Sequence, residues 1–289
     1  MCLIVFAIGA SQRWPLVIAA NRDEFLNRPT LPLASWQTAT GQEIISGRDL
    51  RAGGTWLGTT RGGRVAFLTN VREVESSTAP RSRGELVTRW LEADGDAANF
   101  IAALNKEIGA YGGFNLVLGD FQQNSWTWVT NKSASSLTGW HAQTLAPGVY
   151  GLSNAALDTP WPKTVQLKRV LAATLATHAK KSDIHVLQDE LWAALSSCER
   201  SPREQLPSTG VASAMEEALS SVFVDFPEYA YGTRSSTLLL ATGKVLDAGA
   251  PHLEMYLEER TYLRDKSKVK ADTSLIPSFA RMVWSGHFS

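Results

Sequence analysis

The sequence predicts an α+β fold in which antiparallel sheets are layered with separate pairs of helices. Strand-like runs joined by short turns occupy the start, the middle and the end of the chain, and helical pairs near residues 82–108 and 158–195 separate them. The order is therefore strands, helices, strands, helices, strands. A doubly wound parallel sheet needs strands and helices that alternate one by one, so this order disfavours it.

Length and composition indicate an ordinary globular protein. The 289 residues are enough for a large single core, with 44% hydrophobic and 19% charged residues. Basic and acidic residues number 28 each, so no net charge favours nucleic acid or an anionic membrane. Two cysteines give no disulfide framework, and the N-terminus lacks the basic segment of a secretory signal. No apolar run reaches the ~18 residues of a transmembrane helix.

These features predict a cytoplasmic protein without a nucleic-acid partner or a transmembrane segment. Small-molecule or lipid-like ligands remain as partners, and the sequence leaves the oligomeric state open. We expect a single domain over residues 1–263. The polar residues 264–289 carry no clear pattern, so we expect a loosely held C-terminal tail there.

The opening hairpin is the most informative stretch. Residues 2–7 are apolar and begin with a cysteine, and residues 9–13 form a polar, glycine-containing turn. Residues 16–20 are apolar again and run into the charged sequence Asn-Arg-Asp-Glu at residues 21–24. The pattern predicts a buried β-hairpin that holds the thiol of Cys2 near a polar strand end.

The remaining elements follow from periodicity and from turn and cap residues. Helical spacing predicts helices over residues 82–92, 96–108, 158–175 and 183–195, the first with Ser82 and Glu85 as a capping box and the third with prolines in its first turn. Strands are predicted over residues 44–49, 55–70 as a hairpin, 114–130 as a hairpin, 149–154, 221–224, 235–241, 244–247 and 253–262. Trp126 and Trp128 lie two residues apart, so they share one face of their strand.

Cys2 is the leading candidate for chemistry. Removal of Met1 would leave a thiol and an α-amine on the same residue. The amine titrates near roughly 7.7–8.0 and the thiol near about 8.5, so both act close to neutral pH. The amine can then serve as general base for its own nucleophile. The alternative is that Cys2 is a small apolar core residue of a strand.

Polar residues at several strand ends strengthen the catalytic interpretation. Acyl transfer through a thioester needs oxyanion donors and groups that hold the nucleophile. Arg22 can lower the pKa of the thiol, and Asp23 can accept hydrogen bonds from the α-ammonium group. Asn70 and Asn154 each end a predicted strand and offer neutral amide donors, and Arg234 opens another strand. Taken singly, each of these residues is explained as a turn residue or a surface ion pair; together they predict a site.

A second group of residues is a candidate for substrate binding. Asn21 begins the charged sequence, and Arg48 and Trp56 flank a glycine-rich segment that can line a pocket for an anionic group. The adjacent glycines at residues 53–54 equally suit a plain turn. The five histidines lack the spacing of metal ligands, so we predict no metal site and no cofactor.

The sequence at residues 21–24 names the NRDE family, also called the transport-and-Golgi-organisation family, which this chain resembles. The resemblance covers residues 1–263 and also rests on Met1-Cys2, Gly53-Gly54-Thr55-Trp56-Leu57-Gly58, Leu68-Thr69-Asn70, Gly151-Leu152-Ser153-Asn154 and Thr159-Pro160-Trp161-Pro162-Lys163. That family resembles the N-terminal-nucleophile hydrolases, whose fold is a four-layer αββα sandwich. This fold agrees with the order of strands and helices.

The resemblance also implies roles for the site residues. The cysteine branch of the hydrolases, the bile-salt hydrolases and penicillin V acylases, cleaves amides. By similarity, Cys2 is the nucleophile, Arg22 and Asp23 support it, Asn70 and Asn154 lie near the oxyanion, and Arg234 is a further site arginine. One departure concerns spacing, because those enzymes separate the arginine and the aspartate by two residues. Neighbouring side chains of a strand face opposite sides, so Arg22 and Asp23 both reach Cys2 only where the strand ends or bulges.

Two functions therefore remain open. The first is an N-terminal cysteine hydrolase that cleaves an amide or other acyl bond of a small or lipid-like molecule. The second is a non-catalytic binding or carrier protein for haem or for acyl-CoA and lipids, because the family is associated with haem handling and lipid metabolism. A hydrolase of this kind needs Met1 removed, whereas a carrier does not.

Overall fold

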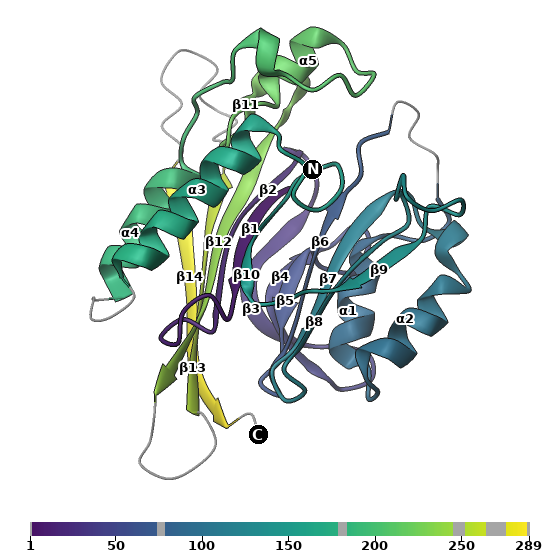
Figure 1. The fold of residues 1–289 in the computed structure, drawn as a ribbon, viewed down its shortest axis with the longest axis vertical. Helices are drawn as coiled ribbons and strands as arrows, with labels where there is room; N and C mark the ends of the chain where they lie inside the picture. Colours follow the sequence, from purple (N-terminus) through teal and green to yellow (C-terminus); the bar gives the residue numbers. More distant parts are fainter. Residues whose placement is uncertain (1, 74–78, 179–183, 245–251, 264–275, 288–289) are drawn as a thin grey trace.

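The computed structural model describes residues 2–73, 79–178, 184–244, 252–263 and 276–287. Two antiparallel sheets of seven strands each lie face to face, and helices cover the outer face of each sheet (Figure 1). The predicted α+β fold, a four-layer αββα sandwich of antiparallel sheets, is confirmed.

The first sheet contains both ends of the described chain. Its order is β10-β1-β2-β12-β13-β14, and β11 pairs with β12. The strands are β1 (Cys2–Ile8), β2 (Leu16–Phe25), β10 (Gly148–Leu152), β11 (Asp225–Phe226), β12 (Tyr231–Lys244), β13 (His252–Leu263) and β14 (Ile276–His287). The predicted opening hairpin is β1 and β2, and its register sets Cys2 opposite Arg22.

The second sheet follows the chain in order from β3 to β9. Its strands are β3 (Thr30–Gln37), β4 (Glu43–Asp49), β5 (Leu57–Thr59), β6 (Arg64–Asn70), β7 (Phe114–Asp120), β8 (Ser125–Thr130) and β9 (His141–Thr144). The predicted hairpins β5–β6 and β7–β8 are confirmed. Trp126 and Trp128 of β8 both face the other sheet, as their spacing predicts.

The helices fall into two groups. Helices α1 (Gly84–Glu92) and α2 (Ala97–Asn105) lie against the second sheet, and α3 (Pro162–Thr177) and α4 (Ile184–Leu195) lie against the first (Figure 1). The short helix α5 (Ser213–Ala218) and the 3-10 turns at Ile108–Ala110, Arg203–Gln205 and Pro227–Tyr229 complete the described helical segments. None of the helices within the described ranges is long and apolar enough to cross a membrane.

Alternate residues of β1 enter different cores. Cys2, Ile4 and Phe6 pack between the two sheets, whereas Leu3 and Val5 pack beneath α3 and α4. The alternation follows from the two-residue period of a strand that is covered on both faces. One end of the space between the sheets therefore contains the thiol.

Several expectations for the connecting segments were wrong. Pro29 and Pro32 favour a break in regular structure over residues 28–32, yet β3 begins at Thr30, at the edge of its sheet, where a missing N–H is tolerated. The two strands predicted over residues 235–241 and 244–247 are not separated, because β12 runs without a break from Tyr231 to Lys244, while residues 245–247 lie outside the described part. Ser82 does not cap α1, whose N-cap is Arg83.

The expected loose tail was also wrong for much of its length. Ile276–His287 forms β14, which pairs along the whole of β13 and becomes the edge strand of the first sheet. The indole of Trp284 enters the core between the sheets, where Ala280 and Met282 also pack. Residues 280, 282 and 284 are thus apolar and face the core at the two-residue period of a strand, although the surrounding segment is polar. Residues 264–275 and 288–289 lie outside the described part.

Candidate active site

Cys2 lies at the first position of β1, with its side chain turned toward the second sheet. The side chain is 8% exposed. Burial raises the pKa of the Cys2 thiol, and the nearby charge of Arg22 opposes this shift without cancelling it. At neutral pH the resting group is therefore the thiol, and its reaction needs a base.

Arg22 lies opposite Cys2 on β2 and shares the inner face of the sheet. Its guanidinium carbon is 4.3 Å from the ring centre of Trp56, and Nη2 is 3.7 Å from Oε2 of Glu24. The Nη1 atom is buried and makes no hydrogen bond to a described group. An unused, buried, cationic donor beside a thiol is suited to an acceptor oxygen of a ligand.

Asp23 faces the other side of β2. Its carboxylate accepts a hydrogen bond of 2.7 Å from the hydroxyl of Thr233, and its backbone carbonyl accepts one of 2.9 Å from the hydroxyl of Tyr231. Burial raises the pKa of Asp23, and the positive charge of Lys163 opposes that rise. The acid is therefore held at the end of β2 on the side of α3.

Arg22 and Asp23 keep the ordinary alternation of a strand, and a bulge lies beside them in the neighbouring strand β12. Arg22 pairs with Ser235 and Asp23 pairs with Thr233, so Arg234 of β12 is the extra residue. The charges of Arg22 and Asp23 both act on the Cys2 thiol, the first lowering and the second raising its pKa. The two side chains thus approach Cys2 from opposite faces of the sheet.

Asn154 and Asn70 join the two sheets beside Cys2. Ile4 pairs with Leu152, and the hydroxyl of Ser153 donates a hydrogen bond of 3.5 Å to the carbonyl of Cys2, so Asn154 follows one residue after this contact. The buried amide of Asn154 donates a hydrogen bond of 2.9 Å to the carbonyl of Asn70 at the end of β6. The Asn154 amide retains one N–H, and the half-buried Asn70 amide makes no hydrogen bond to another described residue. The free N–H of Asn154 is therefore a neutral donor on the side of the sheet that carries Cys2.

Arg234 supports a loop rather than pointing at the thiol. Its Nη1 donates hydrogen bonds to three backbone carbonyls, at 2.9 Å to Phe25, 2.8 Å to Leu26 and 3.1 Å to Arg28. Burial and then the charge of Arg22 lower the pKa of Arg234. It therefore fixes the exit of β2 and adds positive charge near Arg22.

The three substrate-binding candidates have different surroundings. Trp56 lies in the core between the sheets and forms the platform beneath Arg22. Arg48 stacks on Trp36 at 4.5 Å, and Trp36 packs with the core under α1, so Arg48 does not join the group around Cys2. Asn21 is fully buried and faces α4, away from the thiol.

Asn21 uses its whole amide inside the protein. Its Nδ2 donates hydrogen bonds of 2.9 Å to the carbonyls of Leu195 and Val222, and its Oδ1 accepts one of 2.6 Å from Ser236. These bonds tie β2 to the end of α4. The geometry indicates a role in holding the helical layer in place.

We expect Asn21→Ala to lower the free energy of unfolding by about 1–3 kcal/mol, because two carbonyls and a hydroxyl lose a buried partner. Urea unfolding followed by tryptophan fluorescence measures the loss. Asn105→Ala, at an exposed position of α2, is the control and should change stability by less than about 0.5 kcal/mol. Equal stability of the two variants would contradict the assignment.

Two buried ionisable residues near the site were missed at the sequence level. Lys163 donates a hydrogen bond of 2.8 Å to the carbonyl of Leu219, and burial lowers its pKa to about 8 against the opposing charge of Asp23. Glu259 of β13 accepts a hydrogen bond of 2.8 Å from the backbone of Leu33, and burial raises its pKa to about 7. Arg22 partly offsets this second shift, which places Glu259 near the guanidinium.

The sequence contained a signal for each of them. Lys163 stands in the first turn of a predicted helix, where the helix dipole disfavours a cation. Glu259 follows Glu258 within a predicted strand, so one of these two adjacent carboxylates must face the interior. Neither signal identifies the neighbours, because these come from distant parts of the chain.

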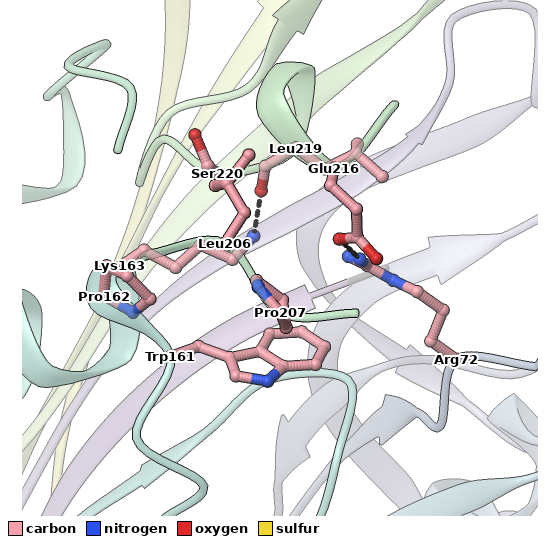
Figure 2. A pocket seen from close by; sticks show the side chains of 9 residues that line it. All are labelled: Arg72, Trp161, Pro162, Lys163, Leu206, Pro207, Glu216, Leu219 and Ser220. Carbon is pink, nitrogen blue, oxygen red and sulfur yellow. Dashed lines mark hydrogen bonds and ion pairs between the residues drawn. The ribbon is translucent and has the colours of Figure 1, made fainter. Parts of the chain in front are cut away.

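A small pocket adjoins the site at the start of α3. Figure 2 shows Lys163, Trp161 and Arg72 around it, with Arg72 paired to Glu216. The guanidinium carbon of Arg72 lies 4.8 Å from the ring centre of Trp161, and its backbone N–H donates a hydrogen bond of 2.8 Å to the carbonyl of Asn154. The pocket is therefore connected to the residues beside Cys2.

Within the described ranges, no three His, Cys, Asp or Glu side chains are grouped so that they could hold a metal ion.

The chain is similar to solved structures at low sequence identity. A mutant of conjugated bile acid hydrolase from Clostridium perfringens is similar over 100% of this chain and 97% of that chain, with a TM-score of 0.52 and 8% identity. An N-acylethanolamine-hydrolyzing acid amidase orthologue from Caenorhabditis elegans covers 83% of this chain and 92% of its own, with a TM-score of 0.45 and 11% identity. The likeness to the bile acid hydrolase confirms a fold like that of N-terminal-nucleophile hydrolases.

Sequence relatives are much closer. The human Transport and Golgi organization protein 2 homolog is 33% identical over 258 residues, which cover 83% of this chain and 88% of that protein. The Bos taurus homolog is 32% identical with the same coverage, and the Drosophila melanogaster protein is 27% identical. The family model described as Transport and Golgi organisation 2 matches residues 1–259. The chain belongs to the Transport and Golgi organisation 2 family.

Proposed function

We propose that this chain is an N-terminal cysteine hydrolase that cleaves an amide or other acyl bond of a small or lipid-like molecule. The observation that carries the proposal is the pairing of Cys2 with Arg22, with the amide of Asn154 bound to the backbone carbonyl of Asn70 nearby. The fold, which is compatible with hydrolase activity, supports it. Removal of Met1 is a condition of the reaction.

The reaction follows from these groups. The α-amine of Cys2 takes the thiol proton, and the sulfur forms a bond to the acyl carbon, which places a negative charge on the carbonyl oxygen. The amides of Asn154 and Asn70, with Nη1 of Arg22, are the donors for this oxyanion. Asp23 accepts a hydrogen bond from the α-ammonium group and so orients it.

The second half restores the enzyme. The α-ammonium group gives its proton to the leaving amine or alkoxide as the acyl–heteroatom bond breaks, and a thioester remains on Cys2. Water, deprotonated by the same amine, attacks the thioester carbon. The carbon–sulfur bond then breaks, a carboxylic acid leaves, and the thiolate takes back a proton. Each atom of the amide and of the water appears in the products.

Acylation of Cys2 is the expected result that tests this function. With a p-nitrophenyl acyl ester, we expect a burst of about one p-nitrophenolate per processed chain and an acyl mass increment on the Cys2 peptide. Cys2→Ala should lose both, whereas Cys198→Ala should keep both, because Cys198 is the exposed second cysteine. Intact mass shows whether Met1 is removed. Retained Met1, or equal labelling of both variants, would refute the hydrolase.

A carrier for haem or for acyl-CoA and lipids is the second candidate. The observation in its favour is that burial keeps the Cys2 thiol protonated, which suits a residue without turnover. The unused Nη1 of Arg22 is then a donor for an anionic group of the cargo. Separate titrations with haem and with acyl-CoA test this function, and the absence of saturable binding to both would remove it.

A further inference from the structure

The small pocket at the start of α3 is lined by two buried cations and one carboxylate. Its volume is about 10 Å³, which is room for one water-sized group, and its walls include Trp161, Lys163, Arg72 and Glu216 (Figure 2). Lys163 is 3% exposed, and the side chain of Arg72 is 6% exposed. The lining therefore carries an excess of positive charge that is largely shielded from solvent.

Arg72 and Glu216 form an ion pair that leaves one buried donor unused. Nη1 of Arg72 pairs with Oε2 of Glu216, and Oε1 of Glu216 accepts hydrogen bonds from the backbone N–H and the hydroxyl of Thr209. Nε of Arg72 is buried and makes no hydrogen bond to a described group. A buried N–H without an acceptor is unfavourable, so Nε indicates an acceptor that the described protein groups do not supply.

The ammonium group of Lys163 also has unused donors. It donates a hydrogen bond of 2.8 Å to the carbonyl of Leu219, its one hydrogen bond within the described residues. Lys163 lies in the first turn of α3, where the helix dipole adds positive potential. Asp23 acts on Lys163 without lining the pocket, yet burial still lowers the pKa of Lys163 to about 8. The protein therefore compensates this buried cation incompletely.

The size and the charge of the pocket select its occupant. A water molecule fits the volume but leaves the excess charge uncompensated. A carboxylate or phosphate group is larger than one water-sized group, and a metal cation is repelled by Lys163 and Arg72. A chloride ion is close to water in size, and it accepts hydrogen bonds from ammonium and guanidinium N–H groups.

We propose that this pocket binds one chloride ion, held by the ammonium group of Lys163 and the Nε–H of Arg72, with Trp161 as one wall. The ion joins the start of α3 to the segment that follows β6 and to residues 206–207 before α5. The backbone N–H of Arg72 donates a hydrogen bond of 2.8 Å to the carbonyl of Asn154, so the ion steadies a segment of the candidate active site. The inference goes beyond the proposed hydrolysis and does not depend on it.

Crystals of the full chain, grown without halide and soaked in sodium bromide, test the site, because bromide replaces chloride and is located by its anomalous scattering. We expect an anomalous peak between Nζ of Lys163 and Nε of Arg72. Lys163→Met keeps the apolar stem without the charge and should abolish the peak. Lys168→Met removes a partly exposed lysine of the same helix that pairs with Asp158 at 2.7 Å, and it should keep the peak. Water alone at this position in wild type would overturn the proposal.

Thermal unfolding separates binding in solution from an effect of the bromide soak. When chloride replaces gluconate, an anion too large for the pocket, at constant ionic strength, the Tm of wild type and of Lys168→Met should rise by about 2–4 °C. The Tm of Lys163→Met should rise by less than about 1 °C, and a rise equal to that of wild type would contradict the site.

These measurements need neither an acyl substrate nor removal of Met1, so their failure is distinct from a failure of the hydrolase. If Lys163→Met does not fold, wild type decides. A bromide peak together with a rise in Tm then supports the chloride site, and the absence of either overturns it.

Discussion

Truncation of Trp56 to alanine is expected to lower the free energy of unfolding by about 3–5 kcal/mol. The indole is 8% exposed and fills the core between the sheets, so its loss removes apolar burial and leaves a cavity. It lies directly over Gly47, where a Cβ would come 2.5 Å from the ring. The indole also packs against the guanidinium group of Arg22, and a buried cation–π contact contributes about 2 kcal/mol.

Urea unfolding measures this loss, and Trp56→Phe is the matched control because it keeps an aromatic face beneath the guanidinium. We expect the phenylalanine variant to lose less than half as much stability as the alanine variant. Alkylation of Cys2 should accelerate in Trp56→Ala, since the thiol becomes more accessible once the neighbouring core is emptied. A loss below about 1 kcal/mol in Trp56→Ala would contradict the platform role of the indole.

Glu259→Gln is expected to gain stability relative to wild type as the pH rises from 4 to 8. The folded carboxyl holds its proton up to about pH 7, whereas the unfolded one releases it near the ordinary value of 4.5. Between these values the folded state binds more protons, so wild type loses stability as pH increases. The stability that wild type loses through this residue is on the order of 3 kcal/mol in full. The glutamine variant does not lose it, because glutamine has no proton to release in this pH range.

The adjacent Glu258 supplies the control, because it faces the other side of β13. Although burial opposes it, hydrogen bonds from Tyr256 and Arg281 lower the pKa of Glu258. Its ionisation therefore stabilises the folded state above about pH 4.5, and Glu258→Gln should lose stability over the same pH interval. Urea unfolding of both variants and wild type at pH 4 and pH 8 provides the comparison. Parallel pH dependences would contradict the effect of burial on the ionisation of Glu259.

Local patterns predicted most of the fold. The opening hairpin, both helical pairs and the β7–β8 hairpin with Trp126 and Trp128 on one face follow from apolar periodicity and turn residues. The errors concern segments whose state depends on a neighbour. Strands β3 and β14 form as edge strands, each of which pairs with one neighbouring strand of its sheet.

The candidate site divides in the same way. Cys2 and Arg22 are brought together by the register of one hairpin, so the sequence predicts their meeting. Asn70 and Asn154 could be identified as strand ends, although the hydrogen bond between them joins two sheets. The buried amide of Asn21 binds the carbonyl of Leu195 at the end of α4, which lies 174 residues further along the chain, so local sequence does not predict this hydrogen bond.

The sequence by itself determined the layered class of the fold, the hairpin that carries the thiol and the family, because these reside in local periodicity and contiguous motifs. Only the tertiary structure decided which charges meet Cys2. Lys163 and Glu259 act on Asp23 and Arg22 through space, and their pKa values depend on desolvation by elements far away in sequence. Electrostatic interaction and burial are properties of distance in the folded chain, and no spacing along the sequence records them.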